Sequence, residues 1–291
     1  LFLIDGERLA GENVDNIDFS RLDMSNVKQI EIVKGAASAL YGSQANGGGI
    51  NIITKDEERP WTLDINHRMA AHNEQRTGAK LGLHKNRISN ALNFARTSIN
   101  NYGVDNGDNP KAMVFSTVYG CNTISLNDKL GVMINDRLKL TARAGYFRRE
   151  TERTPGAPER FYDFSGGRRA KYAGDSQDLE LSYSFDEYDK SDYQSISGLN
   201  VRDYSNVQNI LRGLYNHYFG ADYVLTAGAD FMHDCLMNYY FADGAHEQDV
   251  VDAFAQLDWH LSKKLELQPC EGHLFRGRWL CGSCLQRPDL S

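Results

Sequence analysis

Strict alternation of apolar and polar residues recurs through most of the sequence after residue 56. In residues 137–144 the two faces are formed by Leu138, Leu140, Ala142 and Ala144 and by Arg137, Lys139, Thr141 and Arg143. Residues 178–185 and 252–259 repeat the pattern. Because successive strand side chains point to opposite faces, the pattern predicts strands with one apolar and one charged face. A face this charged does not suit a sandwich core; it suits bulk water or a polar lumen.

The links between these strands separate those two environments. Short links are expected at Lys85-Asn86, Asn135-Asp136, Asp175-Ser176-Gln177, Gly220-Ala221 and Ser262-Lys263. Long links are expected at residues 100–120, 150–167, 191–203 and 239–248, with a short one near Ala71 to Asn73 among them. Short turns at one end and long loops at the other are typical of an outer-membrane barrel, whose strands of about 9–11 residues cross the bilayer.

The predicted fold is therefore mainly β, a partial transmembrane antiparallel β-barrel. About ten or eleven strands are expected. The apolar set should face outward and the charged set inward. The outward set is Leu138, Leu140, Leu179, Leu181, Leu257 and Trp259; the inward set is Lys139, Arg143, Glu180 and Asp258.

Composition excludes some other classes. The 291 residues carry a formal net charge of −7 with a pI near 5.6, which argues against a nucleic-acid partner because such proteins normally present a basic patch. The sequence contains no run of about 18 apolar residues, so no transmembrane helix is predicted. A mean hydropathy of −0.53 is compatible with a membrane barrel, because only alternate residues face lipid. Composition alone would favour a soluble all-β protein.

A different pattern occupies residues 30–55, with the sequence IEIVKGAASALYGSQANGGGINIITK. It predicts a strand, a turn, a short helix at residues 36–40, a glycine-rich loop at Gly47 to Gly49 and a second strand. The glycines precede a strand and no GKS or GKT follows, so a phosphate-binding loop is not indicated. Further upstream, Arg21 is interpreted as a solvated or paired surface charge.

These residues resemble the C-terminal half of the plug domain of TonB-dependent outer-membrane receptors. The matching positions are Glu31, Gly35, Tyr41, Gly42, Gly48, Asn51 and Thr54, and Leu3-Ile4-Asp5-Gly6 resembles an upstream strand and turn of the same domain. Ala36 and the pair Asn46-Gly47 depart mildly from that pattern. The structural motif is assigned to Gly35, Tyr41, Gly42, Gly47, Gly48, Gly49 and Asn51.

The resemblance implies three segments. Residues 1–55 would be the C-terminal part of a small α/β plug inside the curvature of the later strands, and residues 56–267 the N-terminal part of the barrel. Plugged outer-membrane transporters close with about 22 strands, so the chain would hold about half of a barrel. The export signal and the segment that contacts TonB are then expected upstream. Residues 268–291 depart from the strand pattern and are interpreted as an aberrant tail from an altered reading frame. The alternative interpretation of this tail is a zinc site formed by Cys270, His273, Cys281 and Cys284. The sequence shows no flanking strand or knuckle that would favour it.

The resemblance also implies transport, with no bond chemistry. Partners would be the TonB energy-transducing complex, outer-membrane lipid and a small metal chelate. No intrinsic cofactor is expected.

Residues 181–190 and 203–207 resemble the haem and cobalamin receptor branch of Bacteroidetes-type bacteria, so the expected ligand is haem, then cobalamin or a ferric siderophore. Haem needs an axial His or Tyr. Candidate ligand-binding residues in the expected outer links are His72, His246, Tyr102, Phe161, Tyr162 and Phe164; the four aromatic ones are alternatively membrane-girdle residues.

The sequence shows no spacing typical of a nucleophile with its base and no HExxH motif, so the enzyme hypothesis has little support. The alternative to a transporter is a structural or adhesive outer-membrane β-protein, or a non-functional fragment.

Overall fold

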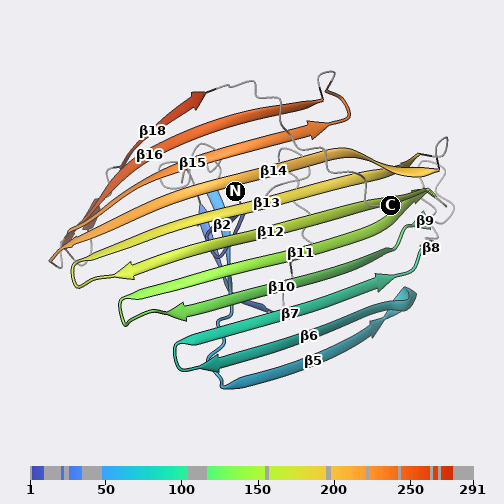
Figure 1. Ribbon diagram of the computed structural model, residues 1–291, viewed down its shortest axis with the longest axis horizontal. Coiled ribbons are helices and arrows are strands. Elements are labelled where there is room, and N and C mark those ends of the chain that lie inside the picture. The colour runs from blue at the N-terminus through green and yellow to red at the C-terminus, as the bar shows by residue number, and fades with distance from the viewer. Residues whose placement is uncertain are drawn as a thin grey trace.

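The computed structural model describes residues 2–9, 21–22, 26–34, 48–103, 117–154, 157–194, 198–220, 223–241, 244–262, 265–267 and 270–277. Two sheets dominate it, and Figure 1 shows the smaller one against one face of the larger. The fold is nearly all β, as the alternating sequence predicts.

The large sheet has twelve strands, and every neighbouring pair is antiparallel. Its strands are β5 (Trp61–Ala70), β6 (Glu74–Lys85), β7 (Ile88–Ile99), β10 (Cys121–Met133), β11 (Leu138–Thr154), β12 (Ala157–Ala173), β13 (Gln177–Gln194), β14 (Leu199–Phe219), β15 (Tyr223–Asn238), β16 (Ala245–Ser262), β17 (Leu265–Leu267) and β18 (Cys270–Gly277). They pair in chain order, except that β18 pairs with β16 beside β17. The predicted tail, residues 268–291, was expected to depart from the strand pattern, but β18 lies within it and pairs with β16. The side chains of β17 and β18 and the structure of residues 278–291 are outside the described part.

The N-terminal sheet has the order β2-β1-β4-β3. Its strands are β1 (Phe2–Ile4), β2 (Glu7–Arg8), β3 (Val27–Lys34) and β4 (Gly48–Thr54). β1 runs parallel to β4, and β3 runs antiparallel to it. The predicted helix at residues 36–40 lies outside the described residues. A separate pair, β8 (Tyr102–Gly103) with β9 (Thr117–Val118), lies in the long link after β7.

Helical structure is confined, within the described residues, to isolated turns such as η4 (Ala71–Asn73). None of the described helical segments has the length and apolar character to cross a membrane.

The short links predicted after β6, β10, β12 and β14 occur where they were expected. We call the end of the large sheet that carries these links the turn end, and the opposite end the loop end.

The prediction of long links at residues 150–167 and 191–203 was wrong. β11 continues to Thr154 and β12 begins at Ala157, while β13 continues to Gln194 and β14 begins at Leu199. The link predicted at residues 239–248 is also shorter, because β16 begins at Ala245. The physical reason is cross-strand pairing between polar residues. Arg160 Nε, for example, donates to Glu150 Oε2 at 2.8 Å, and such pairs keep the hairpin extended where composition indicates a loop.

The face assignment agrees with the structure where side chains are described. Leu140, Leu179 and Leu181 are exposed, the last two at 50% and 53%. Lys139 instead reaches Asp56 at 3.3 Å, and Arg143 reaches Glu7 at 2.6 Å. The charged face of the large sheet therefore faces the N-terminal sheet, and the apolar face points away from it. Trp259 lies among residues whose side chains are not described.

Candidate functional site

The interface between the two sheets is built from ion pairs. Arg21 lies under the large sheet, and its guanidinium contacts the carboxylates of Asp163 on β12 and Asp186 on β13, the latter at 3.0 and 3.1 Å. The guanidinium also lies over the ring of Tyr188, 5.0 Å from its centroid. Arg21 is paired, which was one of the two alternatives, but it is 8% exposed, so its placement at the surface was wrong. A buried guanidinium between two carboxylates fixes the N-terminal segment to the large sheet.

A second set of contacts joins β4 to β10. Lys129 Nζ lies 3.3 Å from Asp5, 2.9 Å from Asp56 and 3.0 Å from Thr54 Oγ1. Asp5 also accepts hydrogen bonds from the Thr54 backbone N–H at 2.8 Å and its hydroxyl at 2.6 Å. Burial alone would raise the pKa of the Asp5 carboxyl, but Lys129 and the Thr54 hydrogen bonds outweigh it, so the pKa lies below its ordinary value.

A third set surrounds β2. Glu7 accepts from Arg143 at 2.6 Å, and Arg169 donates to the Asp5 carbonyl oxygen. Gly167 on β12 faces Glu7 so closely that an added Cβ would lie 2.2 Å from a carboxylate oxygen. Glycine at this position is therefore what lets the carboxylate approach the sheet.

The motif residues of β4 serve the N-terminal sheet itself. Asn51 Oδ1 accepts from the backbone N–H of Gly6 at 2.9 Å, and its Nδ2 donates to Glu31 at 3.0 Å. Gly48 has φ of +102°, a region that favours glycine. Gly49 pairs with Val33. The other predicted motif residues, Gly35, Tyr41, Gly42 and Gly47, lie outside the described residues.

The predicted ligand residues are spread over the loop end and do not converge. His72 and Tyr102 do meet, because their rings stack with centroids 3.7 Å apart and an interplanar angle of 14°. His246 lies on β16, with its ring edge-on to Phe241 at 4.3 Å. Since His72 follows β5 and β16 lies near the opposite edge of the sheet, the two histidines are not brought together.

The three aromatic residues predicted in an outer loop lie on β12, because the link there is shorter than expected. Phe161 is 1% exposed and packs with Tyr188 and Tyr204; the guanidinium of Arg149 lies 4.3 Å from its ring centroid. Phe161 therefore belongs to a buried inward cluster. The placement of all three on a loop was wrong.

Tyr162 and Phe164 point to the opposite face of β12. Tyr162 lies under Arg148, 5.9 Å from ring centroid to guanidinium carbon, and Phe164 packs on Tyr146 at 5.2 Å. They share the outward side of β12, away from Phe161. Their positions favour the girdle alternative over a shared ligand surface with Phe161.

A charged cluster that the sequence analysis missed lies at the loop end. Lys190 Nζ lies 3.6 Å from Glu159, 3.3 Å from Asp192 and 3.6 Å from Asp203. Burial and a hydrogen bond with the Asp192 carboxyl raise the pKa of Asp203 to about 6, although Lys190 acts against them. These residues come from three strands, so no local sequence signal could have joined them.

The comparisons with known proteins agree with this architecture. Residues 1–49 match the family model described as TonB-dependent Receptor Plug Domain. The N-terminal sheet therefore belongs to a segment that is similar to TonB-dependent receptor plug domains.

Two relatives and one solved structure extend the likeness beyond the plug domain. The vitamin B12 transporter BtuB of Photobacterium profundum is 22% identical over 247 residues, covering 82% of this chain and 39% of the relative. The ferric aerobactin receptor of Klebsiella pneumoniae is 28% identical over 145 residues, covering 47% and 18%. A mutant of the ferric enterobactin receptor PfeA of Pseudomonas aeruginosa, in complex with enterobactin, superposes with a TM-score of 0.80 at 15% identity, covering 94% of this chain and 50% of that one.

The structural likeness establishes the fold, an antiparallel sheet of the TonB-dependent receptor barrel type. The chain spans half of that receptor's length and 39% of the BtuB relative.

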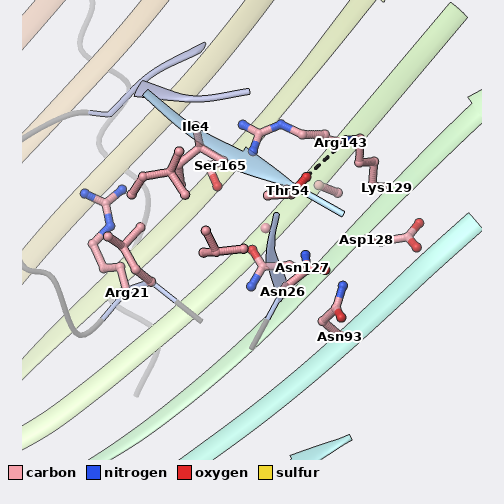
Figure 2. Close-up of a pocket in the computed structure, with 15 residues that line it drawn as sticks. Ile4, Arg21, Asn26, Thr54, Asn93, Asn127, Asp128, Lys129, Arg143 and Ser165 are labelled. Atoms are coloured by element: carbon pink, nitrogen blue, oxygen red, sulfur yellow. Dashed lines mark hydrogen bonds between the residues drawn. The ribbon is translucent and has the colours of Figure 1, made fainter. Parts of the chain in front are cut away.

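A cavity lies between the plug domain and the barrel sheet (Figure 2). Its volume is about 60 Å³, and its lining includes Arg21, Thr54, Asn93, Asn127 and Lys129. Ligand pockets for drug-sized molecules are typically about 300–1,000 Å³, so this space suits water and not a metal chelate.

Within the described part of the chain, no group of three or more His, Cys, Asp or Glu side chains is arranged to hold a metal ion.

Proposed function

We propose that this chain is part of an outer-membrane transporter that takes up a scarce metal chelate with energy from the TonB complex. The observation that carries the proposal is the plug domain seated by buried ion pairs on the charged face of the barrel sheet. Such an arrangement blocks a barrel lumen until the plug rearranges. The named relatives are transporters and receptors, which favours transport over enzyme chemistry.

The outer-membrane location is supported by the outward face of the sheet. Leu140 on β11, Leu179 and Leu181 on β13, and Leu211 on β14 are all exposed there, and exposed apolar surface of this kind suits lipid. The charged inward face then lines the lumen around the plug. The outer-membrane bilayer is thus the proposed partner of the apolar face.

A matched pair of substitutions tests this location. Leu181 and Leu199 are both more than half exposed, but Leu181 lies within the apolar band and Leu199 begins β14 at the loop end. Leu181→Lys should lower the free energy of unfolding in lipid by up to about 2–4 kcal/mol, and Leu199→Lys by about 0–1 kcal/mol. Urea unfolding in lipid vesicles measures both. Equal small effects would mean that the apolar band does not face lipid.

The ligand class is a metal chelate, and the proposed order differs from the expectation from sequence resemblance. BtuB of P. profundum is named for vitamin B12 and matches 82% of this chain, so we place cobalamin first. A ferric siderophore follows, supported by the aerobactin receptor. Haem rests on the branch resemblance and on His72, Tyr102 and His246 alone. The separation of His72 from His246 argues against both serving one haem as a pair.

The decisive experiment is competitive binding to the purified transporter that contains this chain. We expect saturable binding of cyanocobalamin that excess haem and excess ferric aerobactin do not displace. Saturable haem binding instead would restore haem to first place; the double variant His72→Ala with His246→Ala should then shift the haem Soret band. If no chelate of the three classes binds, the transporter proposal fails.

Dependence on TonB separates transport from an adhesive or structural role. Cells lacking the TonB complex should retain surface binding of the ligand and lose its uptake, because the plug then cannot be rearranged. Equal uptake with and without the TonB complex would contradict the proposal. A purely structural β-protein would show neither binding nor uptake.

A further inference from the structure

Among the described residues, the outward face of the barrel sheet carries two charged residues near mid-depth, where apolar residues are expected. Lys129 and Arg169 point inward to the plug domain, so their neighbours Asp128 and Arg168 point outward by strand alternation. Arg168 is exposed and Asp128 is partly exposed. Charges on the lipid side of a barrel are costly and are least tolerated at mid-depth.

Both charges lie at the same depth of the sheet. Asp128 is five residues from Met133, where β10 meets the turn end, and Arg168 is five residues from Ala173, where β12 does so. On β12, Phe164 and Tyr172 share the outward face four residues to either side of Arg168. These aromatic positions resemble the two girdles of a barrel strand, which puts Arg168 midway between them.

Neither charge is neutralised within its own sheet. Asp128 accepts a hydrogen bond from Asn90 Nδ2 at 2.8 Å, which orients the carboxylate but supplies no charge. Within the described ranges, the side chain of Arg168 makes no ion pair and no hydrogen bond, while its backbone lies opposite Ala142 and Tyr183 in the sheet. A partner from outside the chain would relieve both costs.

The strand between them, β11, carries only small outward side chains at the same depth. Asp128 pairs across to Ala144, and Arg168 pairs across to Ala142. Ala144 in turn pairs with Gly166. Small residues allow another protein surface to approach the backbone closely within a membrane. The positive and negative charges thus flank a shallow, flat strip, one strand spacing of about 4.8 Å to either side.

We propose that this surface, which we call the β10–β12 patch, pairs with the same patch of a second copy around a two-fold axis parallel to the barrel axis. Such an axis preserves depth, so when it passes over Ala142 and Ala144 it places Asp128 of each copy opposite Arg168 of the other. The same patch thereby forms two equivalent ion pairs with its copy, as expected for an isologous dimer. The proposal rests on the outer-membrane location proposed above.

Charge exchange tests the pairing directly. The transporter is reconstituted in lipid nanodiscs large enough for two barrels, and its mass is measured by native mass spectrometry across a dilution series. Asp128→Arg or Arg168→Asp alone should weaken the dimer by about a hundredfold, about tenfold for each of the two symmetric pairs. The double variant carrying both exchanges should recover dimerisation, because the charges are complementary again.

Two further variants guard against a folding defect. Ala142→Trp adds bulk on the proposed axis without altering charge and should also give monomers. Arg96→Asp makes the same charge change at an exposed outward arginine near the loop end of β7 and should leave the dimer intact. Heat-dependent migration in detergent gels confirms for each variant that the barrel has formed.

The outcomes decide the proposal separately from the transport function. A monomeric parent, a dimer indifferent to either single exchange, or a double variant that stays monomeric overturns the pairing. A different protein bound stoichiometrically at the patch overturns the second copy as its occupant. Dimers without ligand uptake leave the pairing standing and contradict the transport proposal; monomers with normal uptake do the reverse.

Discussion

The plug interface and the loop-end cluster both hold partly buried carboxylates, yet they treat them in opposite ways. At the plug interface Asp5 receives Lys129 and two hydrogen bonds from Thr54, and the pKa of Asp5 falls. At the loop end Lys190 faces three carboxylates, and the pKa of Asp203 rises to about 6. Burial raises the pKa of a carboxyl at both places. The number of cations and hydrogen-bond donors that face each carboxylate therefore decides whether its pKa ends above or below the ordinary value.

The largest effect should come from removing the most buried cation of the plug interface. Arg21→Met leaves Asp163 and Asp186 as uncompensated buried carboxylates and should lower the free energy of unfolding by about 3–5 kcal/mol. The matched control is Arg137→Met, whose ion pair with Asp175 lies at an exposed turn and should give no measurable change. Urea denaturation followed by tryptophan fluorescence measures both. Equal effects would remove the distinction between buried and exposed pairs.

A smaller loss is expected at the second cation of that interface. Lys129→Met removes the charge shared by Asp5 and Asp56 and should cost about 1–3 kcal/mol near neutral pH. Because the folded-state pKa of Asp5 lies below its ordinary value, the wild-type contribution is present above that ordinary value and is lost as pH falls through the folded-state pKa. The variant should lack this acid-dependent part. Lys139→Met, which contacts Asp56 from a half-exposed position, is the control and should cost about 0–1 kcal/mol.

The smallest effect, and one of opposite sign, is expected at the loop end. The folded state keeps a proton on Asp203 up to about pH 6, whereas an unfolded Asp releases it near 3.9. Stability should therefore fall as pH rises from about 4 to about 6. Asp203→Asn should remove that slope and gain about 1 kcal/mol at pH 7.5, after allowance for solvent screening.

Unfolding midpoints at pH 4.5 and 7.5 measure this change, with the exposed Asp136→Asn as control. A variant whose slope matched the wild type would show that Asp203 does not titrate in this range.

Local alternation predicted the face of each strand correctly because a side chain's direction depends only on its neighbours in the chain. Leu181 outward and Arg143 inward follow from that rule. It could not tell where strands end, because the extension past Glu150 depends on a cross-strand partner, Arg160, that becomes visible only once the register is known.

The burial of Arg21 was missed for a related reason. Its partner Asp186 lies 165 residues away in sequence, and nothing in the polar segment around Arg21 signals so distant a contact. The candidate ligand residues suffered from the same limit. Tyr162 and Phe164 were grouped with Phe161 by proximity in sequence, yet alternation itself sends them to the opposite face.

The order of strands in the large sheet has a consequence for how the protein assembles. Neighbouring strands up to β17 follow one another in sequence, so each hairpin closes over a short loop, with the link between β7 and β10 the longest among the described strands. The plug contacts instead join residues 136 and 165 positions apart. Closing such long loops costs entropy before any contact forms. We therefore expect plug docking to come late, so that loss of Arg21 accelerates unfolding and leaves the folding rate nearly unchanged.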